Sequence, residues 1–481
     1  NLAYDLVSPG NLYFESKSYN GIQQAEQDTV LEYQNRLFVR QDTLPELKVQ
    51  PMSNRSANRG SVVYKLDVNT YSGDKDISSF AYACERIYSN VNVERKKSID
   101  KKLRTLLKYS GLEQGETERE KIIFLENYIK ENYFNVQKGG DDYSTVEGIL
   151  KTKAMSEIGT FRLYDGLLDV AGISYNMVFT CDKSNWRFDA EFENQLSISD
   201  GLLYFPKSDL FIDPMNIFSR GSFVDYDLLD NQGVFIDAVD IGDGFIGFGE
   251  VKNIKGHTAE ESVAEQNINW TFDPETETGE INLVKKSTGY STYNYQIISD
   301  LVPADELEEF KKNIVKSSFG EMELKNLTFE NLSADKYPFE PLTIKATLPA
   351  EEFIEPSANS YVIKLGEVIG KQSELYVVDS VRTLPVAVGN PRTYRHKIVF
   401  NIPEGYILKN TDALNMTITS GEENPVMSFK STYAINDNQL EVNIHEYYTL
   451  GELPKEQFEN YRKVVNAAAD FNKIYLVLEL K

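Results

Sequence analysis

The stretch KAMSEIGTFRLYDGLLDVAGISYNMVFT, residues 153–180, constrains the fold more than any other part of this 481-residue chain. Its first half predicts a helix that begins near Ser156, because a serine hydroxyl can accept from the free N–H groups of a first turn. Phe161 and Leu168 stand at helical spacing and predict the buried face. Gly172 predicts the end of the helix, and YNMVFT predicts a buried strand directly after it.

Two further helices are predicted before this stretch. KKSIDKKLRTLLKYSG places its leucines on one face and stops at Gly111. TEREKIIFLENYIKENY opens with a capping box, in which Thr117 and Glu120 satisfy free N–H groups of the first turn. A short helix is predicted at STVEGILKTK. After residue 180, strands are predicted at ENQLSIS, LLYFP and LFIDP.

Length and composition predict a folded, β-rich chain of several domains. A chain of 481 residues is too long for one core, and its 29 Tyr and 26 Phe lie in many short alternating segments. The net charge of −24 argues against binding to nucleic acid or to an anionic membrane surface. No apolar run reaches the ~18 residues of a membrane span. The two cysteines, Cys84 and Cys181, form no CxxC motif.

The remaining chain predicts mostly strands. INWTFDP and GEINLVKKST predict a hairpin, ADELEEFKKNIVKSS a helix, and PKEQFENYRKVVNAAADF a last helix before the strand KIYLVLEL. Composition and pattern divide the chain into four segments: a β-rich domain at 1–94, a helical and sheet core at 95–250, a β-rich domain with one helix at 251–345, and a sandwich-like β domain at 346–481.

The order of helices followed by antiparallel strands resembles the transglutaminase-like, papain-type superfamily. It is most similar to bacterial envelope proteins in which such a core lies between β-rich domains. Residues 117–133, 144–180 and 202–214 carry the resemblance in the core. RTLPVAVGNPRTYRHKIVFNIPEGYIL resembles the β domain that follows it. The resemblance implies a multidomain α+β fold, helices packed on an antiparallel sheet with β-sandwich-like domains on both sides, and an extracytoplasmic location in the periplasm or cell envelope.

The resemblance also implies a nucleophile that this chain lacks. The family's cysteine stands about fifteen residues before the closing glycine, in a first turn whose dipole lowers the pKa of a thiol. That position is Glu157, and no cysteine occurs between Thr152 and Gly172. The family's histidine is expected within 192–198, which contains none. The matching acid is Asp213 in LFIDP, which a loop or capping role also explains.

We therefore expect a non-catalytic protein that acts in binding or scaffolding. Its partner, a peptide, protein or glycan, is expected to bind in the cleft that holds the substrate in the resembling family. The ligand is expected to be neutral or basic, because several candidate residues are acidic. The expected cleft residues are Glu157, Trp186, Asp189, Glu191, Tyr204 and Asp213.

Three alternatives remain open at this point. One is an active hydrolase or transferase that uses the Cys181 thiol or paired carboxylates. Another is a structural module without a ligand. A third, calcium binding by DAVDIGDGFIGFGE, is disfavoured because the carboxylates do not have EF-hand spacing. No metal and no cofactor is expected.

Overall fold

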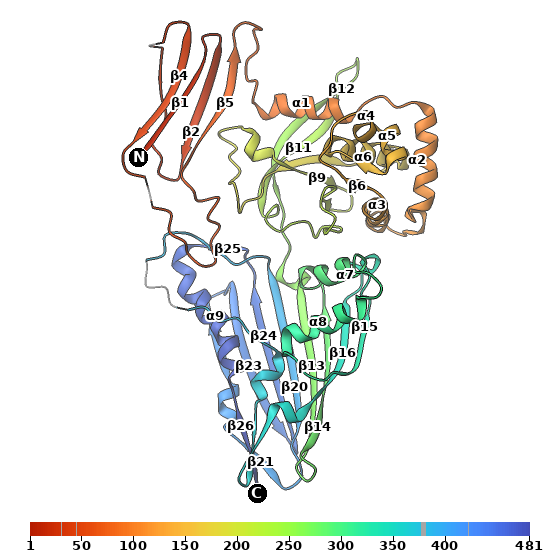
Figure 1. Ribbon diagram of the computed structural model, residues 1–481, viewed down its shortest axis with the longest axis vertical. Coiled ribbons are helices and arrows are strands. Elements are labelled where there is room, and N and C mark those ends of the chain that lie inside the picture. Colours follow the sequence, from red (N-terminus) through yellow and green to blue (C-terminus); the bar gives the residue numbers. More distant parts are fainter. Residues whose placement is uncertain (30, 45, 377–380, 422) are drawn as a thin grey trace. The chain divides into compact units, whose positions relative to one another are not determined.

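The computed structural model describes residues 1–29, 31–44, 46–376, 381–421 and 423–481. The chain forms two compact units, Asn1–Gly256 and His257–Lys481 (Figure 1). Both units contain helices and sheets. The predicted multidomain α+β class is therefore confirmed.

The first unit begins with strands and continues with helices that precede a second group of strands. Its elements are β1 (Leu2–Pro9), β2 (Leu12–Tyr19), β3 (Glu26–Asp28), β4 (Gln34–Gln41), β5 (Ser61–Asn69), α1 (Phe80–Val91), α2 (Lys97–Tyr109), α3 (Glu118–Asn132), β6 (Phe134–Asn135), α4 (Asp141–Ser144), α5 (Val146–Thr152), β7 (Ala154–Met155), α6 (Glu157–Ala171), β8 (Asn176–Thr180), β9 (Asp200–Phe205), β10 (Leu210–Ile212), β11 (Asn231–Asp240) and β12 (Phe245–Ile254).

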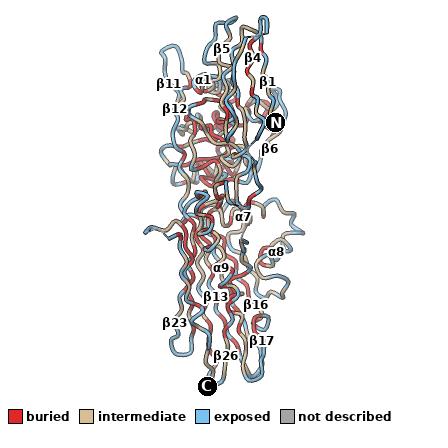
Figure 2. Tube along the Cα trace, turned by 90° about the vertical axis from the view of Figure 1, so that its left-hand side faces the viewer, coloured by how far each residue is buried: buried red, intermediate tan, exposed pale blue. Residues whose placement is uncertain are grey.

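The central sheet of the first unit has the order β10-β9-β8-β11-β12, and all neighbours are antiparallel. The N-terminal strands form two smaller sheets, β1-β4-β3 and β2-β5. Helix α6 shares one hydrophobic core with the central sheet, in which Phe161 and Leu167 lie among Met177, Phe179 and Ile212. This core is the buried interior visible in the upper part of Figure 2. The expected packing of this helix against YNMVFT and LFIDP is confirmed.

Local sequence signals set the ends of two helices as predicted. The Thr117 side chain accepts from the Glu120 N–H, and the Glu120 side chain accepts from the Thr117 N–H, so α3 begins with a complete capping box. Ser156 caps α6 by accepting from Gly159 N. Gly172 ends α6 with a positive φ of 68°, a conformation that glycine adopts without steric cost.

One strand prediction for the first unit is wrong, and one helix was not predicted. Helix α1 lies within residues 1–94, the segment predicted as β-rich, and its buried face is formed by Phe80, Cys84 and Val91. The segment ENQLSIS forms a short 3₁₀ helix, Gln195–Ile198, because Asn194 accepts from Leu196 N and turns the chain.

The second unit is dominated by one large sheet. Its elements are β13 (Val263–Asp273), β14 (Thr278–Ser287), α7 (Tyr293–Ser299), α8 (Leu307–Phe319), β15 (Lys325–Glu330), β16 (Leu342–Pro349), β17 (Ile354–Ser357), β18 (Ser360–Ile363), β19 (Val386–Ala387), β20 (Arg392–Asn401), β21 (Tyr406–Lys409), β22 (Met416–Thr419), β23 (Met427–Asn436), β24 (Gln439–Tyr448), β25 (Glu452–Leu453), α9 (Phe458–Asn472) and β26 (Leu476–Leu480).

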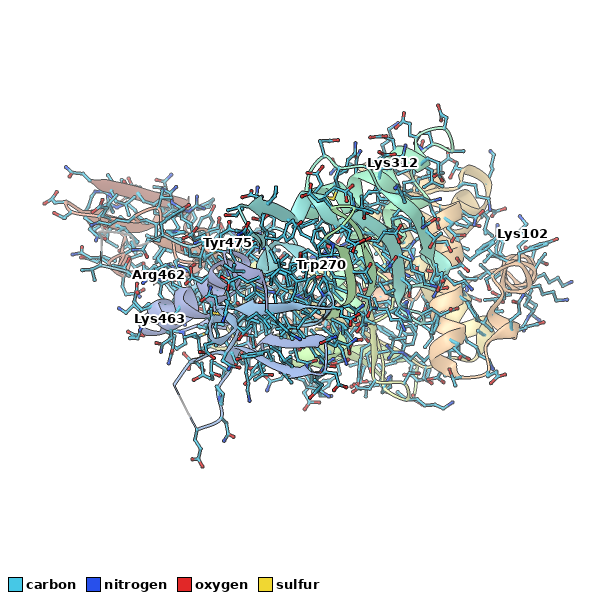
Figure 3. All side chains as sticks on the ribbon, turned by 90° about the horizontal axis from the view of Figure 1, so that it is seen from below. Lys102, Trp270, Lys312, Arg462, Lys463 and Tyr475 are labelled. Atoms are coloured by element: carbon cyan, nitrogen blue, oxygen red, sulfur yellow. The ribbon has the colours of Figure 1, made fainter. Side chains whose placement is uncertain are left out.

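Eight strands of this unit pair in the order β15-β16-β14-β13-β20-β24-β23-β22, and four pair as β17-β18-β26-β21. The two sheets share one core with α9, and Trp270 is completely buried in it. Figure 3 shows Trp270 in the interior, whereas Lys312 on α8 is at the surface. The predicted boundary between residues 345 and 346 falls inside β16, so both flanking segments contribute strands to one sheet.

Candidate functional site

The first turn of α6 is held in place by polar contacts with the segment around α4. The Ser156 hydroxyl donates to Tyr143 O at 3.1 Å and accepts from Gly159 N at 3.3 Å. A Cβ on Gly159 would lie 2.1 Å from Tyr143 O, so the absence of a side chain permits this close approach. Glu157 is the first residue of the helix and is exposed.

A groove with a volume of about 840 Å³ lies beside this first turn. Its apolar lining includes Ile87 and Val91 from α1, together with Phe161 and Phe179. The last two rings are stacked, with centroids 5.6 Å apart. The polar part of the lining includes Asn135, Lys138, Ser156 and Glu157. The groove therefore combines an apolar wall with one carboxylate and one ammonium group, an arrangement suited to holding an amphipathic ligand.

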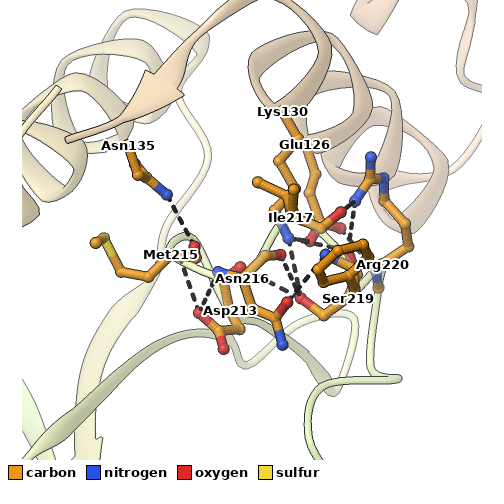
Figure 4. Close-up of polar contacts among 11 residues, drawn as sticks. Glu126, Lys130, Asn135, Asp213, Met215, Asn216, Ile217, Ser219 and Arg220 are labelled. Carbon is orange, nitrogen blue, oxygen red and sulfur yellow. Dashed lines mark hydrogen bonds and ion pairs between the residues drawn. The ribbon is translucent and has the colours of Figure 1, made fainter. Parts of the chain in front are cut away.

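Asp213 shapes the groove without lining it. Its Oδ1 accepts from Met215 N at 2.9 Å and from Asn216 N at 3.1 Å. Met215 lines the groove, and its carbonyl oxygen accepts from Asn135 Nδ2 at 2.8 Å (Figure 4). Burial raises the pKa of Asp213, while nearby Lys130 opposes that shift. Asp213 thus acts as a buried turn residue that positions Met215.

Three of the predicted cleft residues lie where β2 meets the core. The Asp189 carboxylate accepts from Lys17 Nζ at 2.6 Å and from Tyr19 Oη at 2.8 Å. These two donors hold the pKa of Asp189 below its usual value against the opposing effect of burial. Trp186 contacts Tyr19 with ring centroids 4.8 Å apart. Glu191 is exposed and lies 3.8 Å from Lys17.

Tyr204 lies on the other side of the central sheet from α6. Its ring stacks on Phe211, with centroids 4.6 Å apart, and meets Phe235 edge-on at 5.5 Å. These rings belong to a smaller core that excludes the side chains of α6. Of the six residues predicted for the cleft, Glu157 alone lines this groove. The structure does not bring the other five to the groove lining.

A buried ionic cluster behind the groove had no counterpart in the sequence reasoning (Figure 4). Lys130 Nζ lies 2.7 Å from Glu126 Oε1 and 3.0 Å from both the carbonyl and the hydroxyl oxygen of Ser219. Glu126 Oε2 accepts from Gly221 N at 2.7 Å. The sequence does contain one indication of this cluster. Glu126 and Lys130 are four residues apart on a predicted helix, between positions that are otherwise apolar.

The contact between Ser219 and Lys130 resembles a serine–lysine pair, but its surroundings oppose catalysis. Both residues are buried, so a substrate has no direct access to the hydroxyl. Burial lowers the pKa of Lys130, whereas the carboxylate of Glu126 raises it. The pair therefore serves as an anchor between α3 and the loop that follows β10.

Both thiols are buried. Cys181 Sγ lies 3.4 Å from Trp186 O, and burial raises its pKa to about 12. Burial and then Glu193 raise the pKa of Cys84 to about 12. The three histidines are His257, His396 and His445, all in the second unit. Within the described ranges, no three or more His, Cys, Asp or Glu side chains are grouped for metal binding.

Comparison with known proteins gives two likenesses. Residues 362–478 match a family model described as a domain of unknown function with a solved structure, DUF3858. The whole chain is similar to the crystal structure of a "putative protease" from Parabacteroides distasonis, with a TM-score of 0.56 and 9% identity over 99% of this chain and 72% of that one. At this identity the likeness shows a shared fold. No curated protein matches the sequence. Over the described residues, no helix has the length and apolar character needed to cross a membrane.

Proposed function

We propose that this chain is a non-catalytic binding protein with a transglutaminase-like core, and that it holds its ligand in the groove beside the first turn of α6. The observation that carries the proposal is Glu157. It stands at the helix start where the resembling family has its nucleophile, and it borders an 840 Å³ groove with an apolar wall. A carboxylate there can attract a ligand but provides no thiolate for covalent catalysis.

The groove beside Glu157 favours a ligand with an apolar group next to a neutral or basic one, while Lys138 on the same lining can accommodate an acidic group elsewhere on that ligand. Ile87, Ile158 and Met215 are half-buried residues of the lining that offer apolar contacts, and Glu157 offers a charge for an ammonium or guanidinium group. An extended peptide, a loop of a protein partner or a glycan with an amino substituent meets this requirement. Because Glu157 is exposed, salt screens the attraction between its charge and the ligand. At 0.1 M ionic strength the screening length is about 10 Å.

The proposed location is the bacterial cell envelope, outside the cytoplasm. This proposal rests on the resemblance of the core and of the β domains around it to envelope proteins. Fractionation of cells that produce the full-length protein tests it, with the protein expected in the periplasmic or envelope fraction. Recovery with cytoplasmic markers would contradict the proposal.

An active hydrolase is the second candidate, and the name of the similar crystal structure favours it. Cys181 would be its nucleophile, or a carboxylate pair would act as acid and base. Burial of Cys181 and the position of all histidines in the second unit oppose the thiol route. Asp189 and Asp213 do not line the groove beside Glu157, which opposes a carboxylate pair there.

A binding screen with short peptides and cell-wall glycan fragments tests the proposal. Each hit is titrated against the parent, Glu157→Gln and Glu309→Gln, and the ligand mass is followed for turnover. Glu309 is the matched control, since it is also exposed in the first turn of a helix, α8. Glu157→Gln is expected to raise Kd about twofold to fivefold, as loss of an exposed ion pair does, and Glu309→Gln to leave it unchanged.

Two results would contradict the proposal. Equal Kd values for all three proteins would show that the groove is not the binding site. A change in ligand mass that requires the folded protein would show catalysis and support the hydrolase.

A further inference from the structure

Strand β12 forms one edge of the central sheet in the first unit. The sheet ends in the order β8-β11-β12, and β12 pairs over all ten residues with β11. No strand among the described residues pairs with its other edge. The N–H and C=O groups along such an edge can pair with a further strand.

The surroundings of β12 leave its outer edge open to pairing. Helix α1 covers one face, where a Cβ on Gly247 would lie 2.3 Å from Tyr88 Cβ and one on Gly249 would lie 2.4 Å from Cys84 Sγ. On the opposite face Phe248 is 56% exposed. Proline residues and β-bulges commonly protect the edge strand of a sheet, and β12 has neither. It therefore presents an exposed aromatic side chain next to unpaired backbone.

The charges of β12 are self-complementary in one register. Glu250 and Lys252 lie on the same face as Phe248, because alternate residues of a strand share a face. Their side chains are 57% and 44% exposed and form an ion pair 2.9 Å long. If a second copy pairs antiparallel about a two-fold axis at Val251, each Glu250 lies opposite Lys252 of the other copy. Val251, 36% exposed, then faces itself on the axis.

We propose that the free edge of β12 pairs with β12 of a second copy of this chain, in the register that centres on Val251. Two-fold pairing joins the two five-stranded sheets into one continuous sheet. A two-fold axis one residue earlier would set Glu250 against Glu250, which like charges disfavour. The charges therefore select the register, while backbone hydrogen bonds and Phe248 supply the attraction. This self-association is independent of the groove beside α6.

Charge reversal tests the register directly. In Glu250→Lys or Lys252→Glu, two attractive cross-strand pairs become two repulsive ones, and self-association is expected to weaken about tenfold. The double variant Glu250→Lys/Lys252→Glu restores opposite charges and is expected to associate like the parent. An equimolar mixture of the two single variants is expected to form mixed dimers, because the two lysines of one copy then lie opposite the two glutamates of the other.

Sedimentation equilibrium of the full chain over a concentration series measures the association constant. Glu330→Lys is the matched control, since Glu330 is also an exposed strand residue paired with a lysine, Lys345. It is expected to leave the association constant unchanged, and circular dichroism checks that every variant is folded. A monomeric parent at all concentrations overturns the proposal. So do a dimer that is equally strong in all variants and a dimer that the control weakens as much as the single reversals.

Discussion

Asn135 joins the two segments that border the groove, since its Nδ2 donates to the carbonyl oxygen of Met215 at 2.8 Å. Its Oδ1 accepts from Thr160 Oγ1 at 3.1 Å, so one side chain also fixes the segment after α3 to α6. Asp213 holds the turn that presents Met215. The groove therefore depends on a short chain of hydrogen bonds that the protein forms without a ligand, a degree of preorganisation that favours binding.

Replacement of Asn135 by Ala is expected to lower the free energy of unfolding by about 1–3 kcal/mol, because it removes two hydrogen bonds and deprives the Met215 carbonyl oxygen of its Asn135 donor; Thr160 Oγ1 can still donate to Ser156 O. It is also expected to weaken binding of any groove ligand. Urea unfolding and ligand titration measure the two effects. Asn132→Ala is the control, because Asn132 forms one exposed hydrogen bond to Tyr128 O nearby. An equal effect of both variants would contradict the role given to Asn135.

Breaking the buried pair of Glu126 and Lys130 is expected to be far more costly. Lys130→Met removes the ammonium partner of the buried Glu126 carboxylate, and a loss of about 3–5 kcal/mol in unfolding free energy is expected. The double variant Glu126→Leu/Lys130→Met is expected to lose less than Lys130→Met alone, because it removes both charges of the pair together, while buried Arg220 keeps its hydrogen bonds to the carbonyl oxygens of Ile217 and Ser219. Urea unfolding compares the variants. A double variant less stable than both single ones would contradict this account of the cluster.

The buried carboxyl of Glu446 predicts a pH dependence of stability. Burial raises its pKa to about 7, against the opposing effects of Tyr448 and Arg392. The folded protein therefore holds this proton more tightly than the unfolded chain. Stability from this group is full below the unfolded pKa of about 4.3 and is lost as pH rises through about 7.

Glu446→Gln is expected to flatten this fall in stability between pH 5 and pH 7.5, which urea unfolding at several pH values measures. Glu441 on the same strand is the control. Hydrogen bonds from Asn443 and Lys397 lower its pKa, so it is already ionised throughout this range and Glu441→Gln should leave the slope unchanged. A parent protein whose stability is constant from pH 5 to pH 7.5 would contradict the prediction.

The two cysteines are expected to react slowly with iodoacetamide at neutral pH. A pKa of about 12 leaves very little thiolate in the native protein, and burial restricts access to it. Mass spectrometry of the labelled peptides should show alkylation at least about tenfold faster in urea than in buffer. Fast, selective labelling of native Cys181 would instead indicate an activated thiolate and favour the hydrolase.

Local sequence signals predicted the ends and buried faces of the helices well. The capping box at Thr117, the cap at Ser156 and the stop at Gly172 act through neighbours in sequence, and all three are observed. Helix α1 was missed although Phe80, Cys84 and Val91 follow a helical period. The strands around it dominated the composition of that region.

The composition of the site was less accessible to sequence reasoning. The position of Glu157 at the start of its helix was predicted correctly by counting back from Gly172, because both residues belong to the same helix. Asp189 is held by Lys17, 172 residues earlier in the chain, and no local pattern reveals such a contact. The side of the sheet on which Tyr204 lies depends on the register of its strand. The alternation of apolar and polar residues does not fix this register, and a shift of one residue moves every side chain to the other face.

The groove beside the first turn of α6 is proposed to bind a ligand without converting it. Amide hydrogen exchange of the full chain, with and without a peptide or glycan hit from the screen, tests both parts of this proposal. Slower exchange is expected only in the groove segments, residues 135–140 and 154–162, together with a ligand of unchanged mass after the incubation. Protection confined to other segments, or a ligand recovered as cleaved or transferred product, would contradict it.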